Sequence, residues 1–249
     1  MVLSLLCAAA LATAPPPAAP YFTDFSDRDA VLKDWTLADS CEHCKKEDGD
    51  DAECTKMTPS ATTFSQADGM IHHTTQVDHK KTSCGAFATS GHATWNTQVR
   101  YGNLTVVAAF FPGPEAQVNS STGFIGLDSS GNVGSITMGF HGKGWPGYDG
   151  PPYKYQHGIY ADSTKSHHRE YTDTGKRSIA EMNTYGLLWT KDKVEWSFNG
   201  EIVRTFDKAK DVPQMAMGLR LHSRTGYGDE FVEGGSFTAQ FRSFRFTPL

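Results

Sequence analysis

The chain has 249 residues, of which 23 are Lys or Arg and 28 are Asp or Glu, so its formal net charge at pH 7 is −5. With 38% hydrophobic and 20% charged residues, the composition supports a full apolar core and excludes wholesale disorder. The mild acidity and the lack of a long basic block argue against nucleic acid as a partner. All-β chains of this length often form one domain, and a single domain is our expectation.

The amino terminus is typical of a secretory signal peptide. Val2–Ala12 is an apolar run that is too short to span a bilayer, for which about 20 residues are needed. Small residues and the tract Pro15-Pro16-Pro17 follow it, as expected near a cleavage site. We therefore predict a signal peptide at 1–19, a mature domain at 20–249, secretion and no membrane partner. A short hydrophobic anchor is the alternative.

Four cysteines, Cys41, Cys44, Cys54 and Cys84, follow the predicted signal peptide. In an oxidising compartment they predict two disulfides, with three possible pairings that the sequence does not separate. Cys41-x-x-Cys44 also has zinc-ligand spacing, but Cys54 and Cys84 do not supply the second pair that a zinc ribbon needs. We expect no metal, and we expect the acidic segment 42–53 to be a solvated loop tethered by disulfides. Calcium there is disfavoured because its acidic residues match no EF-hand spacing.

Strand patterns dominate the rest of the chain. Leu104–Phe111 is β-branched and aromatic between turn residues, whereas the short segment Asp29–Lys33 is a helix candidate. Val194–Phe198 alternates strictly, and Asn199-Gly200 then predicts a hairpin that returns through Ile202–Phe206.

Two further stretches alternate with the same period. Met215, Met217, Leu219 and Leu221 form one apolar stripe. Near the carboxyl end Phe237, Ala239 and Phe241 share a face, whereas Phe244 and Phe246 are one step out of phase. This slip predicts a β-bulge near Arg242-Ser243. Strands separated by turns, without βα alternation, predict an antiparallel sandwich.

The strand Gly134–Gly142 carries the most information about function. Ile136, Met138 and Phe140 form one apolar face, so Ser135, Thr137, Gly139 and His141 form the other. Aromatic residues follow at Trp145, Tyr148, Tyr153 and Tyr155. A small polar face beside aromatics suits a groove in which sugar rings stack and sugar hydroxyls form hydrogen bonds. A solvated face with nothing bound explains the same pattern.

Several segments resemble glycoside hydrolase family 16 (laminarinase-type) of the concanavalin A-like lectin/glucanase superfamily. Tyr101–Thr105 resembles the family's "YGRFEAR" strand entry, and Thr184–Trp196 resembles its "TYAIEWTPDKIRW" segment. Phe198–Val203 resembles the "VDGKLV" turn that follows. The resemblance covers roughly Phe22–Phe246 and implies an all-β fold, an antiparallel β-sandwich of the concanavalin A-like jelly-roll type.

The family's catalytic strand carries Glu-x-Asp-x-Glu, and the resemblance places that motif on Gly134–Gly142. The three positions are occupied by Ser135, Thr137 and Gly139. Retaining hydrolysis needs two carboxyl groups about 5–5.5 Å apart, and none of these residues supplies one. The resemblance therefore implies a glucanase fold without its catalytic carboxylates.

A second resemblance is to alginate-lyase-type jelly rolls. Gly139–Gly144, followed by Pro151–Tyr155, is similar to their "QIHGK…PP…K" stretch. His141 matches their histidine, but Gly139 stands at their glutamine position and no counterpart of their carboxyl-terminal tyrosine motif is present. The set for proton abstraction from a uronic acid is thus incomplete.

Arg220 and His222 face away from the apolar stripe at 215–221 and are candidates for the same sheet face as His141. The pairs His72-His73 and His167-His168 lack metal-ligand spacing, and we expect both at the surface.

We predict a secreted, monomeric protein that binds a β-glucan or related polysaccharide without hydrolysis or cofactor. The alternative is an active polysaccharide-cleaving enzyme, a hydrolase or lyase, with rearranged catalytic residues. The candidate ligand-binding residues are Ser135, Thr137, His141, Trp145, Tyr148, Arg220 and His222.

Overall fold

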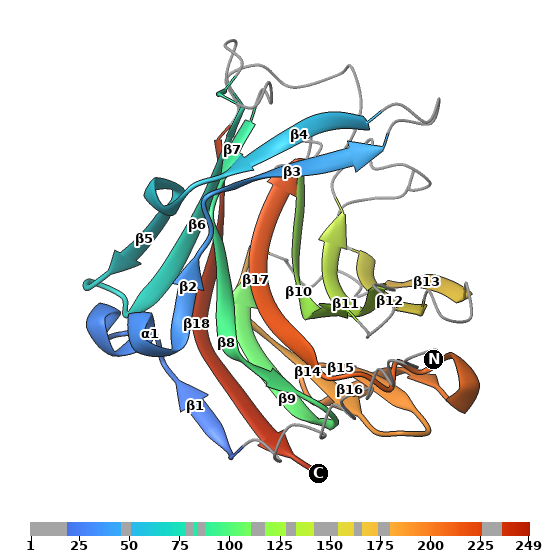
Figure 1. The fold of residues 1–249 in the computed structure, drawn as a ribbon. Helices are drawn as coiled ribbons and strands as arrows, with labels where there is room; N and C mark the ends of the chain where they lie inside the picture. The colour runs from blue at the N-terminus through green and yellow to red at the C-terminus, as the bar shows by residue number, and fades with distance from the viewer. Residues whose placement is uncertain are drawn as a thin grey trace, which may run out of the picture.

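Two β-sheets packed against each other form the body of the computed structural model (Figure 1). The structure describes residues 19–45, 51–77, 82–83, 88–110, 118–127, 133–141, 154–161, 166–173, 180–225 and 236–249. The predicted signal peptide lies outside these residues except for its last position. No helix within these ranges is long and apolar enough to cross a membrane.

Sheet A contains 11 strands and sheet B contains seven. The strands of sheet A are β1 (Tyr21–Thr23), β3 (Ser40–Lys45), β4 (Asp51–Met57), β5 (Thr62–Ser65), β6 (Met70–Val77), β7 (Ala88–Ser90), β9 (Gly102–Ala109), β14 (Asn183–Trp189), β15 (Val194–Phe198), β16 (Glu201–Phe206) and β18 (Ser236–Pro248). The strands of sheet B are β2 (Trp35–Leu37), β8 (His92–Val99), β10 (Val118–Leu127), β11 (Val133–His141), β12 (Lys154–Ala161), β13 (Ser166–Asp173) and β17 (Met217–Thr225). The helical elements are α1 (Arg28–Asp34) and the short 3₁₀ turns η1 (Pro59–Ala61) and η3 (Ala209–Asp211).

Sheet A has the order β16-β15-β14-β9-β18-β6-β7-β4-β3, with β1 paired to β18 and β5 paired to β6. Sheet B has the order β13-β12-β11-β10-β17-β8-β2. Of the strand pairs within the described residues, β4 and β7 alone run parallel. The predicted antiparallel β-sandwich is confirmed.

The hairpin between β15 and β16 has the turn that its sequence predicts. Asn199 and Gly200 both have positive φ, at 51° and 86°. Turns of this kind match the right-handed twist of the flanking strands and favour Asn-Gly, because neither residue is strongly strained there. The helix expected at Asp29–Lys33 is also present as α1, whose first turn is capped by the Asp27 carboxylate.

The predicted β-bulge in the last strand is confirmed. The register between β18 and β9 shifts between Phe241 and Ser243. Because of this extra residue, Phe241, Phe244 and Phe246 all reach the core and are fully buried. Phe244 packs edge-on against Trp35 and Trp95 of sheet B, so the bulge brings a second aromatic row to the sheet interface.

Two sequence predictions in the amino-terminal part are wrong. The expected loop is absent at both ends of the acidic segment, because 42–45 and 51–53 belong to the paired antiparallel strands β3 and β4, with Cys41 opposite Lys56 and Cys44 opposite Ala52. Residues 46–50 lie outside the described residues. Charged residues are common on strands at a sheet edge, where they oppose aggregation, so charge alone did not indicate a loop. The pairing of the four cysteines stays a prediction, and Cys84 lies outside the described residues.

His73 is the second correction, since it is buried rather than at the surface. It lies on β6 between Thr62 of β5 and Ala239 of β18, and its ring packs 5.0 Å from that of Phe241. Neither ring nitrogen has a hydrogen-bond partner among the described residues. Burial, with smaller effects of His92 and His72, lowers the pKa of His73 to about 3.

The bulge can be tested by comparing two phenylalanines of the same sheet. Phe244→Ala should lower the free energy of unfolding by about 3–5 kcal/mol, because it empties a core position. Phe22→Ala, in β1, removes a side chain that is 55% exposed and should cost under about 1 kcal/mol. Urea unfolding measures both, and equal losses would place Phe244 outside the core.

His73 makes stability depend on pH. Its folded pKa lies below the ordinary value of 6.5, so between pH 6.5 and 3 the unfolded chain binds a proton that the folded chain does not. His73 therefore does not affect the free energy of unfolding above pH 6.5. As the pH drops from 6.5 to 3, its contribution lowers the free energy of unfolding by up to about 1.4 kcal/mol per pH unit. In His73→Leu the free energy of unfolding should depend less steeply on pH between 3 and 6.5, by the slope that corresponds to about one proton. Unfolding experiments at several pH values measure this slope, and an unchanged slope would contradict the lowered pKa of His73.

Candidate functional site

The candidate site lies on the face of sheet B that points away from sheet A, called here the outer face. Ile136, Met138 and Phe140 of β11 are fully buried in the core between the sheets. The alternation of the strand therefore turns Ser135, Thr137 and Gly139 to the outer face. The indole Nε1 of Trp196, on sheet A, donates to the Thr137 carbonyl oxygen at 3.0 Å and holds β11 in this register.

A row of residues crosses the centre of the outer face at the level of Thr137. Gly123 of β10 and Gly158 of β12 lie on either side of Thr137 in register. Arg220 of β17 is the next neighbour on one side, and Arg169 of β13 is the next on the other. In this register Arg220 lies on the same face of sheet B as Thr137.

A second row runs beside the first and contains more side-chain polar groups. In order across the sheet it consists of His92, His222, Ser121, Gly139, Gln156 and Tyr171. The rings of His92 and His222 lie 5.9 Å apart. Gln156 Nε2 donates to Thr137 Oγ1 at 3.3 Å, so a hydrogen bond links the two rows at the middle of the site.

The remaining predicted residues divide into two groups. Ser135 lies in a third row, between Ile125 and Tyr160, on the same face as Thr137. His141 ends β11 opposite Asn119, and its side chain lies outside the described part. Trp145 and Tyr148 also lie outside the described residues.

Sequence reasoning missed Gln156, Gly158 and Arg169 as members of this face. Their own strands alternate, with Tyr155, His157 and Ile159 buried, and that alternation was the available signal. Which strands lie beside β11 was not readable from the pattern, so these residues were not connected to Thr137.

The outer face has no pair of carboxylates within the described residues. The seven strands of sheet B contain two acidic residues, Glu170 and Asp173, both on the edge strand β13. Glu170 points toward sheet A and pairs with Arg204 of β16, whereas Asp173 lies opposite Lys154 on the outer face. Nor do the described residues contain a group of three or more His, Cys, Asp or Glu that could hold a metal ion.

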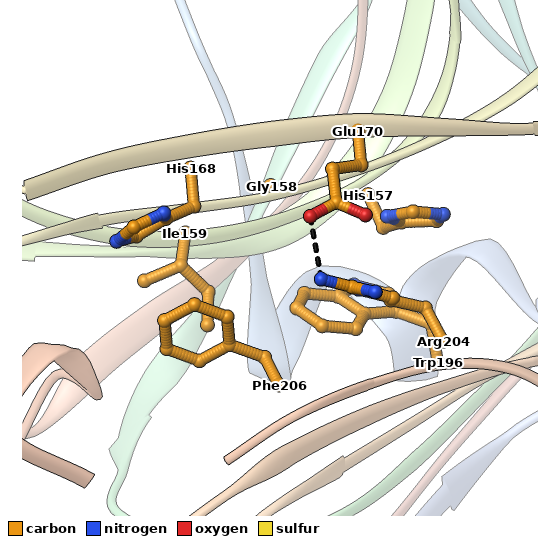
Figure 2. A pocket seen from close by; sticks show the side chains of 8 residues that line it. All are labelled: His157, Gly158, Ile159, His168, Glu170, Trp196, Arg204 and Phe206. Carbon is orange, nitrogen blue, oxygen red and sulfur yellow. Dashed lines mark hydrogen bonds and ion pairs between the residues drawn. The ribbon is translucent and has the colours of Figure 1, made fainter. Parts of the chain in front are cut away.

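A small cavity lies elsewhere, where the edges of the two sheets meet (Figure 2). Its volume is about 10 Å³, which is room for roughly one water molecule and not for a sugar ring. His157 lines it, with Nε2 2.7 Å from Thr172 Oγ1, and burial followed by the charge of Arg204 lowers its pKa to about 4. The Arg204–Glu170 ion pair spans the two sheets here. The cavity is therefore a seam between the two sheets.

Comparison with known proteins gives a consistent result. The family described as glycosyl hydrolases family 16 matches residues 50–241. A stretch of 78 residues is 33% identical to the Crh-like protein CRH11 of Candida albicans, and it spans 29% of this chain and 17% of that protein's length. The alignment thus leaves most of that relative unmatched.

Solved structures agree along nearly the whole chain. A β-1,3-1,4-glucanase (lichenase) from a mouse hindgut metagenome is 16% identical, with a TM-score of 0.73 over 93% of this chain and all of that one. The Bacillus licheniformis β-glucanase is 14% identical, with a TM-score of 0.71 over 93% of this chain and 99% of that one. At these identities the likeness shows a common fold.

Two side chains at the cavity test what holds β11 in register. Trp196→Phe removes the hydrogen bond to the Thr137 carbonyl and part of a buried ring, and should cost about 2 kcal/mol or more in the free energy of unfolding. Arg204→Gln breaks an ion pair whose partners are 39% and 48% exposed and should cost less than about 1 kcal/mol. Unfolding in denaturant measures the loss of stability in both variants. A larger loss in Arg204→Gln than in Trp196→Phe would contradict the conclusion that Trp196 holds β11 in place.

Proposed function

Because this chain belongs to glycosyl hydrolase family 16 and has no carboxylate at the three positions where the family resemblance expects them, we propose that it binds a polysaccharide without hydrolysing it. The polymer is a β-glucan or a related polysaccharide, and it lies across the outer face of sheet B. The observation that carries this proposal is the outward orientation of Ser135, Thr137 and Gly139 at the centre of that face.

The chemistry of these three residues supports binding and not turnover. Retaining hydrolysis needs one carboxylate as nucleophile and a second carboxyl group as acid and base. The hydroxyls of Ser135 and Thr137 do not ionise near neutral pH, and Gly139 has no side chain. Asp173 of β13 lies opposite Lys154, and β12 separates β13 from β11, so Asp173 does not stand across a scissile bond from a residue of β11.

The same face has groups suited to sugar hydroxyls. Thr137 and Gln156 share a hydrogen bond, and the half-buried Thr137 hydroxyl is of a type that both donates to and accepts from sugar hydroxyls. Gly123 and Gly158 flank Thr137 and keep the centre of the row free of bulky side chains. A flat sugar ring can therefore approach the sheet closely.

The proposal includes features that follow from the sequence. The chain is secreted after loss of residues 1–19, is a monomer, and forms disulfides among Cys41, Cys44, Cys54 and Cys84. His141, further along the same strand as Thr137, also binds the ligand, and Trp145 and Tyr148 provide stacking surfaces for sugar rings. None of these features involves a cofactor.

The competing function is a polysaccharide-cleaving enzyme with its acid and base at unfamiliar positions. Family membership favours this alternative, and it requires two groups outside β11 to meet over the outer face. The two functions differ in a product that is simple to measure.

The purified protein should be incubated with laminarin, lichenan, xyloglucan and alginate. We expect retention on at least one of these polymers when it is immobilised on a solid support, with no new reducing ends and no ultraviolet absorbance from an unsaturated uronate. New reducing ends without that absorbance would demonstrate hydrolysis, and the absorbance would demonstrate elimination. Either product would replace the binding function with an enzymatic one.

Variants locate the surface that binds. Thr137→Val and Trp145→Ala should each weaken retention, because one removes a central hydroxyl and the other a stacking surface. Lys191→Ala, in an exposed turn of sheet A, is the control and should behave as wild type. If the single variants Thr137→Val, His141→Ala and Trp145→Ala are all retained as strongly as wild type, the outer face is excluded as the binding surface.

A further inference from the structure

The strands of sheet B differ in charge from the rest of the molecule. They contain four basic residues, Lys154, Arg169, Arg220 and Arg224, against the two acidic residues of β13. The whole chain has a net charge of −5. Sheet B is therefore locally positive on a negative protein.

The orientation of the charged residues concentrates this positive charge on the outer face. Glu170 points toward sheet A and is neutralised by Arg204, which leaves Asp173 as the carboxylate of the outer face within the described strands. Lys154, Arg169 and Arg220 all occupy outward register positions. Among the described strands of sheet B, cationic residues thus outnumber anionic ones on the outer face.

The two arginines lie on opposite sides of the centre. Arg220 and Arg169 belong to the same row as Thr137, each two strands away from it. Neighbouring strands are about 4.8 Å apart, so the backbone positions of the two arginines are roughly 19 Å apart. Between them the row contains Gly123, Thr137 and Gly158. An extended polymer crossing the strands would pass over this central track and meet a guanidinium at each end.

We propose that the polysaccharide bound by this face is polyanionic and carries sulfate or carboxylate groups along its length. This inference rests on the binding function proposed above, and among the ligands named there it selects a related, charged polysaccharide over a neutral β-glucan. Guanidinium groups bind sulfate and carboxylate through two parallel hydrogen bonds. A positive face on a negative protein also steers an anionic polymer toward that face and away from the rest of the surface.

The absence of acidic residues from β11 acts in the same direction. Three carboxylates at 135, 137 and 139 would repel an anionic chain at the centre of the row, whereas two hydroxyls and a glycine do not. The composition of β11 and the arginines on β13 and β17 are separate observations, and both favour an anionic ligand.

Matched polymers test the charge requirement. The full protein should be titrated with κ-carrageenan and with agarose, which differ in sulfate on a similar galactan, and with polygalacturonate and its methyl ester, which differ in free carboxylate. Laminarin is the neutral β-glucan. We expect at least one anionic member to bind about tenfold or more tightly than its neutral partner, with affinity falling as salt rises. The two pairs distinguish sulfate from carboxylate recognition.

Charge-neutral variants test the location. Arg169→Gln and Lys154→Gln should each reduce affinity for the anionic polymer about threefold, and the double variant about tenfold. Lys191→Gln removes the same charge from an exposed turn of sheet A and should leave affinity within about twofold of wild type. Circular dichroism confirms the fold of each variant, and Arg169→Glu should weaken binding further than Arg169→Gln.

The outcomes separate the two proposals. The polyanion inference would be overturned if the protein bound laminarin as tightly as the anionic polymers, or if Lys191→Gln and Arg169→Gln lost the same amount of affinity. Either result would leave the proposal of polysaccharide binding intact. Retention on none of the polymers would overturn both proposals.

Discussion

The packing of Ile136, Met138 and Phe140 against sheet A is the constraint on which the functional argument depends. These side chains are fully buried, and side chains in a strand alternate with a period of two. A shift of one residue would bring Ser135, Thr137 and Gly139 into an aromatic core and expose three large apolar groups. Burial of one side of β11 therefore determines what the other side presents to a ligand.

The core is able to impose this register because both sheets contribute aromatic side chains. Phe140 contacts Phe110, which directly follows β9, and Tyr185 of sheet A. Tyr155 of the adjacent strand contacts Tyr185 and Phe198. Aromatic pairs of this type prefer particular offsets and tilts. The bulge in β18 extends the same interface by placing Phe244 and Phe246 in phase with the core.

Local periodicity made much of the fold and part of the site predictable. The hairpin at Asn199-Gly200, the bulge near Ser243 and the outward positions in β11 each follow from a few consecutive residues. Neighbours in space were not predictable, because strand order depends on how distant segments pair. Gln156 and Arg169 join Thr137 only through the order β13-β12-β11, and His73 is buried only because β5 and β18 lie on both sides of β6.

Binding and catalysis make different demands on such a sheet. A polymer meets a face built from several strands, and its affinity is the sum of many modest contacts. Hydrolysis requires two carboxyl groups held at one distance across one bond. β11 has no carboxylate at positions 135, 137 and 139, whereas Gln156, Arg220 and Arg169 of the same face lie on other strands. The proposed function is binding for this reason. Carboxylates at these positions would also carry negative charge, so under the proposed function the same three residues bear both on turnover and on which polymers the face attracts.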